Sequence, residues 1–182
     1  MRFKNNAASI CLALLGMLLS VPVPGQTAPT ALKSGDILPS LAGQGLTGKW
    51  IDIASVSSGS PAVVVFSFSR AGGRDAQLWT QRLMKDEPHL AIYTVIFLES
   101  VPGLFRATAV SGIKNGMPPA LQDRTILLYQ DENLWKQRLQ VANERHACIL
   151  LLGPAGRIRW MTLGPFADPI YSDLSKSIPT VN

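Results

Sequence analysis

Cys148 is the side chain best suited to nucleophilic chemistry, and His146 precedes it by two positions. An imidazole beside a cysteine favours the reactive thiolate, and residues two apart on a strand share a face. The apolar residues 149–152 favour instead a buried, inert thiol, because free cysteine is among the most buried residue types. Cys11 lies in an apolar N-terminal segment, so no disulfide is expected in a mature chain. Cys148 is therefore the candidate catalytic thiol, with a structural role favoured.

A second candidate site combines two arginines with two glycines at a turn. Arg70, Gly72, Gly73 and Arg74 follow an apolar run and precede a helical pattern. The free N–H groups of a helix N-terminus and two guanidinium groups can bind an anion, such as a carboxylate of a partner chain. In the alternative interpretation both arginines are solvated and the glycines only allow the turn. The sequence leaves both interpretations open.

Metal, cofactor and nucleic-acid chemistry are not expected. The chain has two histidines and two cysteines, and His89 has no partner at a spacing typical of metal ligands. The net charge of +5 comes from scattered lysines and arginines rather than from basic runs. We therefore expect no metal site, no cofactor and no bound nucleic acid.

A strand, a short loop and a helix must position the arginine and glycine site. Residues 62–68 form a run rich in Val and Phe without charge, typical of a strand buried on both faces of a sheet. After a loop of small residues, Leu78, Trp79 and Leu83 recur at helical spacing. This spacing predicts a helix over residues 74–85 with those three side chains facing the core.

The remaining pattern predicts an α/β fold with a mixed sheet flanked by helices, in a single domain over residues 29–182. The expected elements are a hairpin within residues 35–55, strands over 90–98, 125–130, 147–152 and 157–163, and helices over 102–113, 131–139 and 169–177. Asp131 is the expected N-cap of the helix that follows it.

The helix over residues 102–113 belongs to a less regular stretch. One apolar side would face the core, made up of Leu104, Phe105, Ala109 and Ile113. Gly112 and Gly116 would interrupt a longer helix. Residues 101–119 would form either the wall of a partner-binding groove or a simple helical cap on the sheet edge.

Residues 1–28 have the layout of an export signal. Arg2 and Lys4 precede the apolar stretch 7–23, and small residues follow it. We expect a cleaved signal peptide and a periplasmic or secreted protein. The alternative is an uncleaved N-terminal anchor, which would then be the only membrane contact.

Two parts of the chain resemble the thioredoxin-like superfamily, in its redoxin and thiol-specific antioxidant branch. They are the strand–loop–helix unit of residues 62–83 and the ending LLLGPAGRIRWMTLGPF, which is similar to the final hairpin of that family. The resemblance implies that residues 71–74 occupy the slot of the two redox cysteines, and that Ala147 stands near the cis-proline position. Neither feature is present, so the resemblance implies a thioredoxin-like fold with a degenerate active site.

The segments FSFSRAGGRDAQLW and VPGLFRATAVSGIKNGMPPALQDR resemble bacterial relatives of the mitochondrial ATP synthase assembly factor that chaperones a membrane-sector subunit. That resemblance implies a protein partner. The first hypothesis is an exported, non-catalytic binding or assembly factor that uses the degenerate site and residues 101–119 as its contact surface. The second is a weak one-cysteine antioxidant or thiol oxidoreductase that uses Cys148. We favour the first, because thiolate chemistry needs an accessible, electropositive position.

Overall fold

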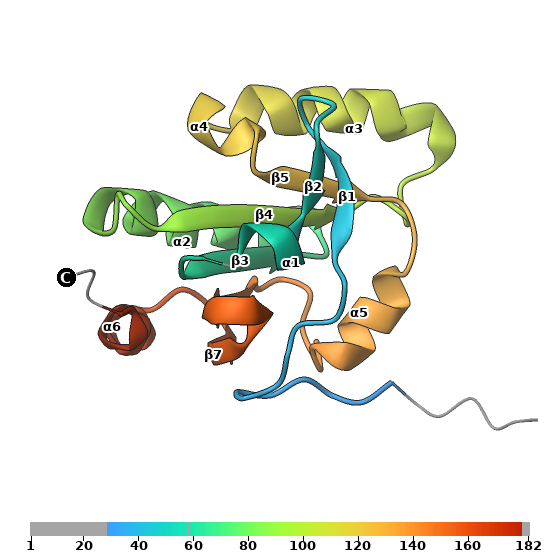
Figure 1. Ribbon diagram of the computed structural model, residues 1–182. Helices are drawn as coiled ribbons and strands as arrows, with labels where there is room; N and C mark the ends of the chain where they lie inside the picture. The colour runs from blue at the N-terminus through green and yellow to red at the C-terminus, as the bar shows by residue number, and fades with distance from the viewer. Residues whose placement is uncertain (1–28, 58, 180–182) are drawn as a thin grey trace, which may run out of the picture.

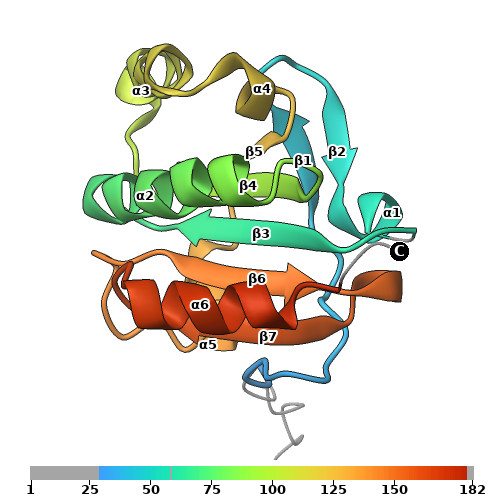
Figure 2. The same ribbon diagram turned by 90° about the vertical axis from the view of Figure 1, so that its left-hand side faces the viewer.

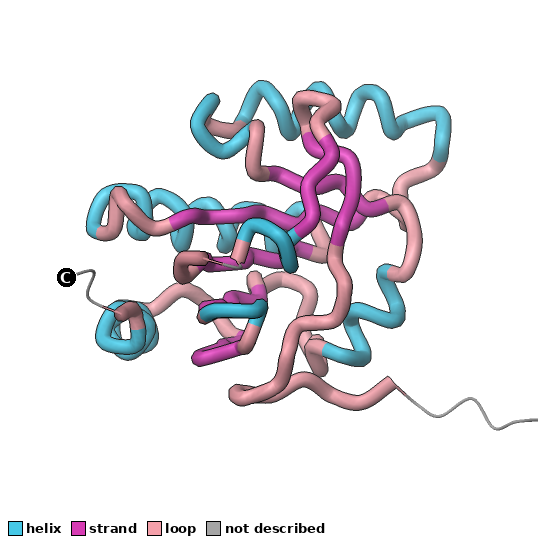
Figure 3. The backbone as a smooth tube through the Cα atoms, viewed as in Figure 1, coloured by secondary structure: helices cyan, strands magenta, loops and turns pink. Residues whose placement is uncertain are grey.

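A seven-stranded mixed sheet forms the centre of the protein (Figures 1 and 3). The computed structural model describes residues 29–57 and 59–179. In sequence order the strands are β1 (Ala42–Gly45), β2 (Trp50–Asp52), β3 (Ala62–Ser67), β4 (Ala91–Phe97), β5 (Thr125–Leu128), β6 (Cys148–Leu152) and β7 (Ile158–Leu163). Across the sheet the order is β2-β1-β5-β4-β3-β6-β7.

Strand β3 is the interior strand that its composition predicts. Every one of its residues is buried. It pairs in parallel with β4 and antiparallel with β6, so that Val64 lies between Tyr93 and Leu150. A strand with neighbours on both sides and helices over both faces must be apolar throughout, and this explains its Val-rich sequence.

Helices cover the two faces of the sheet (Figure 2). On one face lie α2 (Arg70–Asp86) and α6 (Asp168–Ser177), and on the other lies α5 (Glu132–Arg138). The connection from β4 to β5 contains α3 (Gly103–Gly116) and α4 (Pro119–Gln122). A one-turn helix α1 (Ile53–Val56), which the sequence pattern did not predict, follows β2, and a 3₁₀ turn (Pro154–Gly156) joins β6 to β7.

The alternation of side chains along β3 and β6 divides the core into two layers. Val64, Phe66 and Cys148 belong to the layer under α5, together with Trp135. The opposite layer includes Trp79 of α2, which is fully buried. These two layers and the strand order confirm the predicted thioredoxin-like α/β fold and its single domain.

The helix prediction is wrong in several details. Helix α2 begins at Arg70 rather than at Arg74, because Ser69 caps it one turn earlier. Leu78 is half exposed, and the buried face of α2 is completed by smaller side chains. Helix α3 continues through Gly112 as far as Gly116, because an isolated glycine weakens a helix without having to end it.

The predicted signal or anchor segment, residues 1–28, lies outside the described residues. Within residues 29–57 and 59–179, no helix has the length and apolar character that a membrane span requires.

Candidate functional site

Ser69 fixes the start of α2 and ties it to the loop before β6. Its hydroxyl oxygen accepts a hydrogen bond from the N–H of Gly72 (3.0 Å) and donates to the carbonyl oxygen of Glu144 (2.6 Å). The resemblance to thioredoxins places the degenerate redox slot in a loop and first turn, whereas here residues 71–74 are all helical. The Ser69 side chain thus caps the N-terminus of α2 at the N–H group of Gly72.

The two glycines of this site have different roles. A Cβ atom on Gly72 would lie 2.7 Å from the Glu144 carbonyl oxygen, closer than real Cβ contacts allow. Gly72 is therefore required by the close approach of α2 to the loop before β6. A Cβ atom on Gly73 would meet no atom within 4 Å, and Gly73 lines a groove that is described below.

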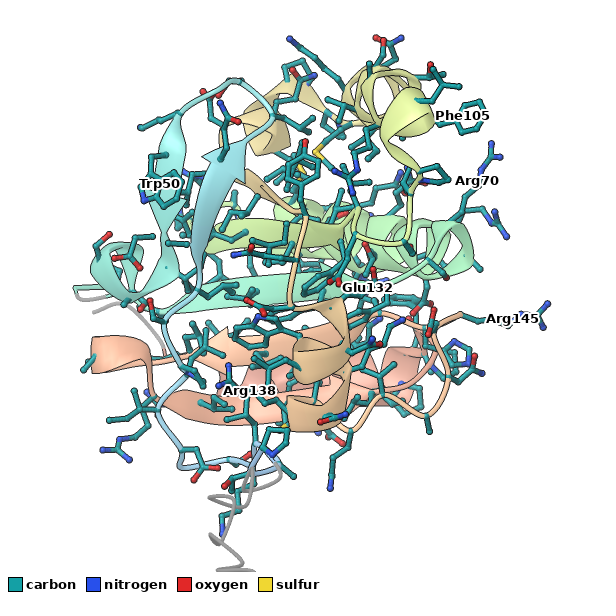
Figure 4. The ribbon with its side chains drawn as sticks, turned by 90° about the vertical axis from the view of Figure 1, so that its right-hand side faces the viewer. Trp50, Arg70, Phe105, Glu132, Arg138 and Arg145 are labelled. Atoms are coloured by element: carbon teal, nitrogen blue, oxygen red, sulfur yellow. The ribbon has the colours of Figure 1, made fainter. Side chains whose placement is uncertain are left out.

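Arg70 and Arg74 are both exposed, on the first two turns of α2. Among the described residues neither arginine forms an ion pair. Figure 4 shows Arg70 extending from the fold on the same side as Phe105 of α3. The structure thus brings the arginines close to residues 101–119, a proximity that the sequence pattern did not predict.

Ala147, which the resemblance to thioredoxins places near the cis-proline position, has an ordinary trans peptide bond, and no peptide is cis within the described residues. Its N–H donates a hydrogen bond to Oδ2 of Asp75 (2.8 Å), and the N–H of Phe166 donates to Oδ1 of the same carboxylate (2.9 Å). A proline has no N–H to donate. The buried Asp75 therefore fastens α2 to two backbone segments that the sequence analysis had not linked to it.

Cys148 is almost fully buried, with 2% of its surface exposed. It pairs with Phe66 of β3 and with Leu163 of β7. Burial raises the pKa of the thiol well above its usual value, which holds it in the neutral form. His146 lies in the loop before β6, so the strand alternation that would place it beside Cys148 does not extend to it. The structure does not assemble the predicted thiol and imidazole pair on one strand.

A groove of about 800 Å³ lies between α3 on one side and α2 with β4 on the other. Its apolar lining includes Phe68, Ile96, Leu98, Ala109, Ile113 and Leu121. Arg70, Gly73 and Arg74 of the candidate anion site line it as well. Of the two interpretations of residues 101–119, the geometry is that of a groove wall.

Helix α3 differs from the other long helices because none of its residues is buried. Leu104 and Phe105, predicted to face the core, are 85% and 58% exposed. Ala109 and Ile113, from the same predicted face, pack partly buried against a small cluster that includes Leu98. The first turn of α3 therefore leaves an apolar surface uncovered at the end of the groove.

Residues 32–180 match the family described as ATP10 protein. The chain belongs to the ATP10 protein family. No curated protein sequence matches it significantly.

Solved structures with a similar fold include proteins named as a thiol-disulfide oxidoreductase, a thiol:disulfide interchange protein and a thiol peroxidase. The thioredoxin domain of a thiol-disulfide oxidoreductase from Bacteroides vulgatus has a TM-score of 0.57 at 21% identity, with 82% of this chain and 100% of that chain covered. A protein from Chlorobium tepidum that is described as a thiol:disulfide interchange protein DsbE has a TM-score of 0.57 at 16% identity, with 81% of this chain and 96% of that chain covered. A thiol peroxidase from Chromobacterium violaceum has a TM-score of 0.52 at 18% identity, with 80% of this chain and 88% of that chain covered. At these identities the likeness establishes the fold alone.

This ATP10 family member also has an ion network that the sequence analysis missed. The Lys136 ammonium lies 2.7 Å from carboxylate oxygens of both Glu132 and Glu144. Burial disfavours the charged lysine, but the two carboxylates outweigh it and raise the pKa of Lys136 above its usual value. Because the carbonyl of Glu144 also accepts from Ser69, this network links α5 to the N-terminus of α2. The sequence signal was the i, i+4 spacing of Glu132 and Lys136.

The predicted N-cap of α5 is also corrected in this family member. Asp131 occupies the N-cap position, but its backbone is left-handed (φ 65°) and its side chain makes no capping hydrogen bond. The N–H of Glu132 donates instead to Oε2 of Glu99 (2.7 Å). A carboxylate from the loop after β4 thus takes the role that a local cap was expected to play.

Proposed function

We propose that this ATP10 family member is an exported, non-catalytic assembly factor that binds a protein partner through the groove between α2 and α3. The observation that carries the proposal is the position of the groove. It opens at the N-terminus of α2, where the resemblance to thioredoxins places the redox motif, and it is lined there by arginines and a glycine instead of cysteines. A binding surface at this place needs no thiol.

The burial of Cys148 supports a non-catalytic role. A nucleophilic thiol has to be accessible and at least partly ionised, whereas Cys148 is enclosed by apolar side chains. We expect Cys148 in the native protein to react slowly with iodoacetamide near neutral pH and rapidly after denaturation in urea. Fast alkylation of the native protein, followed by mass spectrometry, would favour the one-cysteine antioxidant or oxidoreductase instead.

The assembly role is tested by deletion of the gene and complementation. ATP synthase is the complex to follow first, because of the resemblance to its assembly factor. We expect the deletion to lower the amount of assembled enzyme in membranes, measured on native gels, and Cys148→Ser to restore it fully. A deletion strain with normal ATP synthase would reject this role.

The two arginines provide a more specific test of the contact surface. We expect the double variant Arg70→Ala, Arg74→Ala to unfold at the same temperature as the wild type, because both side chains are exposed and unpaired among the described residues. It should complement the deletion poorly, since truncating the arginine of a desolvated arginine–carboxylate contact weakens binding by about 2–5 kcal/mol. Full complementation by this variant would remove the arginines from the contact surface.

Export is the part of the proposal that rests on residues 1–28. The basic start and the apolar stretch 7–23 support it. Cell fractionation combined with N-terminal sequencing of the mature protein would test both the compartment and the cleavage. Recovery of an uncleaved chain in the membrane fraction would indicate the anchored alternative, and an uncleaved chain in the cytosol would reject export.

A further inference from the structure

We propose that the groove binds an apolar α-helix of the partner protein, with small residues along its contact face and a carboxylate near one end. The inference rests on the proposed function, because it names the kind of segment that the assembly factor would hold. Four features of the described residues carry it: the paired floor of the groove, the glycines of α3, the hydroxyl of Thr94 and the two arginines.

The floor of the groove excludes an added β-strand. It is formed in part by β4, which pairs with β3 on one side and with β5 on the other, so its backbone hydrogen-bonding groups are already used. A peptide strand binds by adding to an unpaired strand edge, and β4 has none. A helix satisfies its own backbone and requires from the groove only an apolar surface, which Ile96, Leu98 and Leu121 supply.

Helix α3 presents glycines to the groove at helical spacing. Gly112 and Gly116 are four residues apart, both line the groove, and a Cβ atom on either would meet no atom within 4 Å. Two glycines at this spacing allow a second helix to approach closely, as in small-residue helix contacts of membrane proteins. In the interior of an exposed helix a glycine such as Gly112 otherwise costs about 1 kcal/mol relative to alanine. The position of the two glycines thus favours a helix as the occupant.

Thr94 supplies a second, independent sign of a ligand. Thr94 is one of the residues that line the groove, only 3% of it is exposed, and its enclosed Oγ1 has no hydrogen-bond partner among the described residues. A buried hydroxyl normally has a partner. An acyl chain would leave this hydroxyl unpaired, whereas a helix that approaches closely through small residues can offer it a carbonyl or hydroxyl oxygen.

Charge complementarity places an acidic group at one end of the occupant. Arg70 and Arg74 line the groove from the first turns of α2, where the helix dipole adds positive potential. A carboxylate in the last turn of the bound helix would meet both guanidinium groups with its own negative helix end nearby. An α-helix of about 10 Å diameter occupies roughly 400 Å³ per turn, so the groove accommodates on the order of two turns.

The test uses a synthetic helical peptide of about 20 residues, long enough to be helical on its own. One face is Leu and Ala, the other is Gln, and a single Glu stands in the last turn; a matched peptide carries Gln in its place. Binding to the folded domain is measured by fluorescence anisotropy. We expect Gly112→Leu, which fills the groove, to weaken binding at least tenfold. Ser111→Leu, one residue away on α3 and outside the groove lining, should bind as the wild type does.

The charge and the hydroxyl are tested separately. Replacing Arg70 and Arg74 by Gln should abolish the preference for the Glu peptide over the Gln peptide, whereas Arg145→Gln, an exposed arginine outside the groove lining, should preserve it. Thr94→Val should weaken binding several-fold while the free protein melts at the same or a higher temperature. If the Thr94 hydroxyl had only a structural role, its removal would lower the melting temperature and leave the binding unchanged.

The contrary outcomes are distinct. No binding of the peptide, or equal binding by Gly112→Leu, would overturn the proposal. Saturable binding of a fluorescent fatty acid that Gly112→Leu abolishes, without binding of the peptide, would overturn it in favour of a lipid. If deletion impairs ATP synthase assembly and Gly112→Leu restores it, the helix proposal fails while the proposed function survives. If deletion has no effect on assembly, the proposed function itself fails.

Discussion

The buried thiol of Cys148 should make the protein less stable at alkaline pH. Burial raises its pKa in the folded state, whereas in the unfolded chain a cysteine has a pKa of about 8.5. Above that pH the unfolded state loses a proton that the folded state keeps, so the free energy of unfolding should fall by about 1.4 kcal/mol per pH unit. Below pH 8.5 this contribution is fully present.

The measurement is urea unfolding of the reduced protein between about pH 8.5 and 10. Burial also raises the pKa of Tyr171 to about 12, so this tyrosine adds a similar fall only above the unfolded value of about 10. The variant Cys148→Ala should start from a lower stability and lack the cysteine part of the slope. Equal slopes in the two proteins would show that the thiol ionises in the folded state.

Asp75 supports the candidate site from a buried position, so its removal should lower the free energy of unfolding. Its carboxylate accepts from the N–H groups of Ala147 and Phe166, so Asp75→Ala leaves one buried and one partly buried donor without a partner. Each orphaned donor costs about 1–3 kcal/mol, which predicts a loss of roughly 2–6 kcal/mol in chemical denaturation. Asp173→Ala on the exposed side of α6 is the control and should change little. A loss below about 1 kcal/mol for Asp75→Ala would mean that water replaces the carboxylate.

Strand β3 supports a prediction at the scale of elements. Val64 is fully buried between β4 and β6, and Val64→Asp would place an unpaired carboxylate in the core. The cost of several kcal/mol compares with a total stability of about 5–15 kcal/mol, so we expect no soluble, cooperatively folded protein. Gln44→Asp, at an exposed position of β1, should express and unfold like the wild type. A soluble Val64→Asp protein with normal circular dichroism would contradict this place for β3.

The strand and helix order was predictable because each main element has its own pattern of apolar residues. The apolar run of β3 and the spacing of Trp79 and Leu83 on α2 are local signals. The start of α2 was not predicted, because glycines after Ser69 indicate a loop when their neighbours are unknown. Glycine is required at position 72 because of the carbonyl of Glu144, which lies more than seventy positions away in the sequence. Distant partners of this kind cannot be derived from spacing.

The candidate site was predictable only in pieces. Arg70, Arg74 and the segment 101–119 were each identified from the sequence, but only the fold places them around one groove. Asp75 was missed, since an acidic residue inside a helical pattern normally indicates a solvated face. Leu104 and Phe105 were assigned to the core because an apolar pattern does not distinguish a face that packs on the sheet from one left uncovered.

At the scale of the whole molecule, two well-filled core layers contrast with a third, thinner cluster under α3. Val63, Val65 and Phe66 are completely enclosed, whereas Val101, Val110 and Met117 are only partly buried against Leu46 and Leu127. The helix proposed to bind a partner is therefore attached to the fold by a smaller apolar cluster than either core layer.

This uneven attachment has a consequence for the rates of amide hydrogen exchange. Local opening takes place first where few apolar contacts must be broken, so the amides of α3 should exchange far faster than those of β3, which open only in global unfolding. The same measurement with a bound helix should slow exchange selectively in α3 and in the first turns of α2. Equal protection of α3 and β3 in the free protein would show that α3 is held as firmly as the core strand.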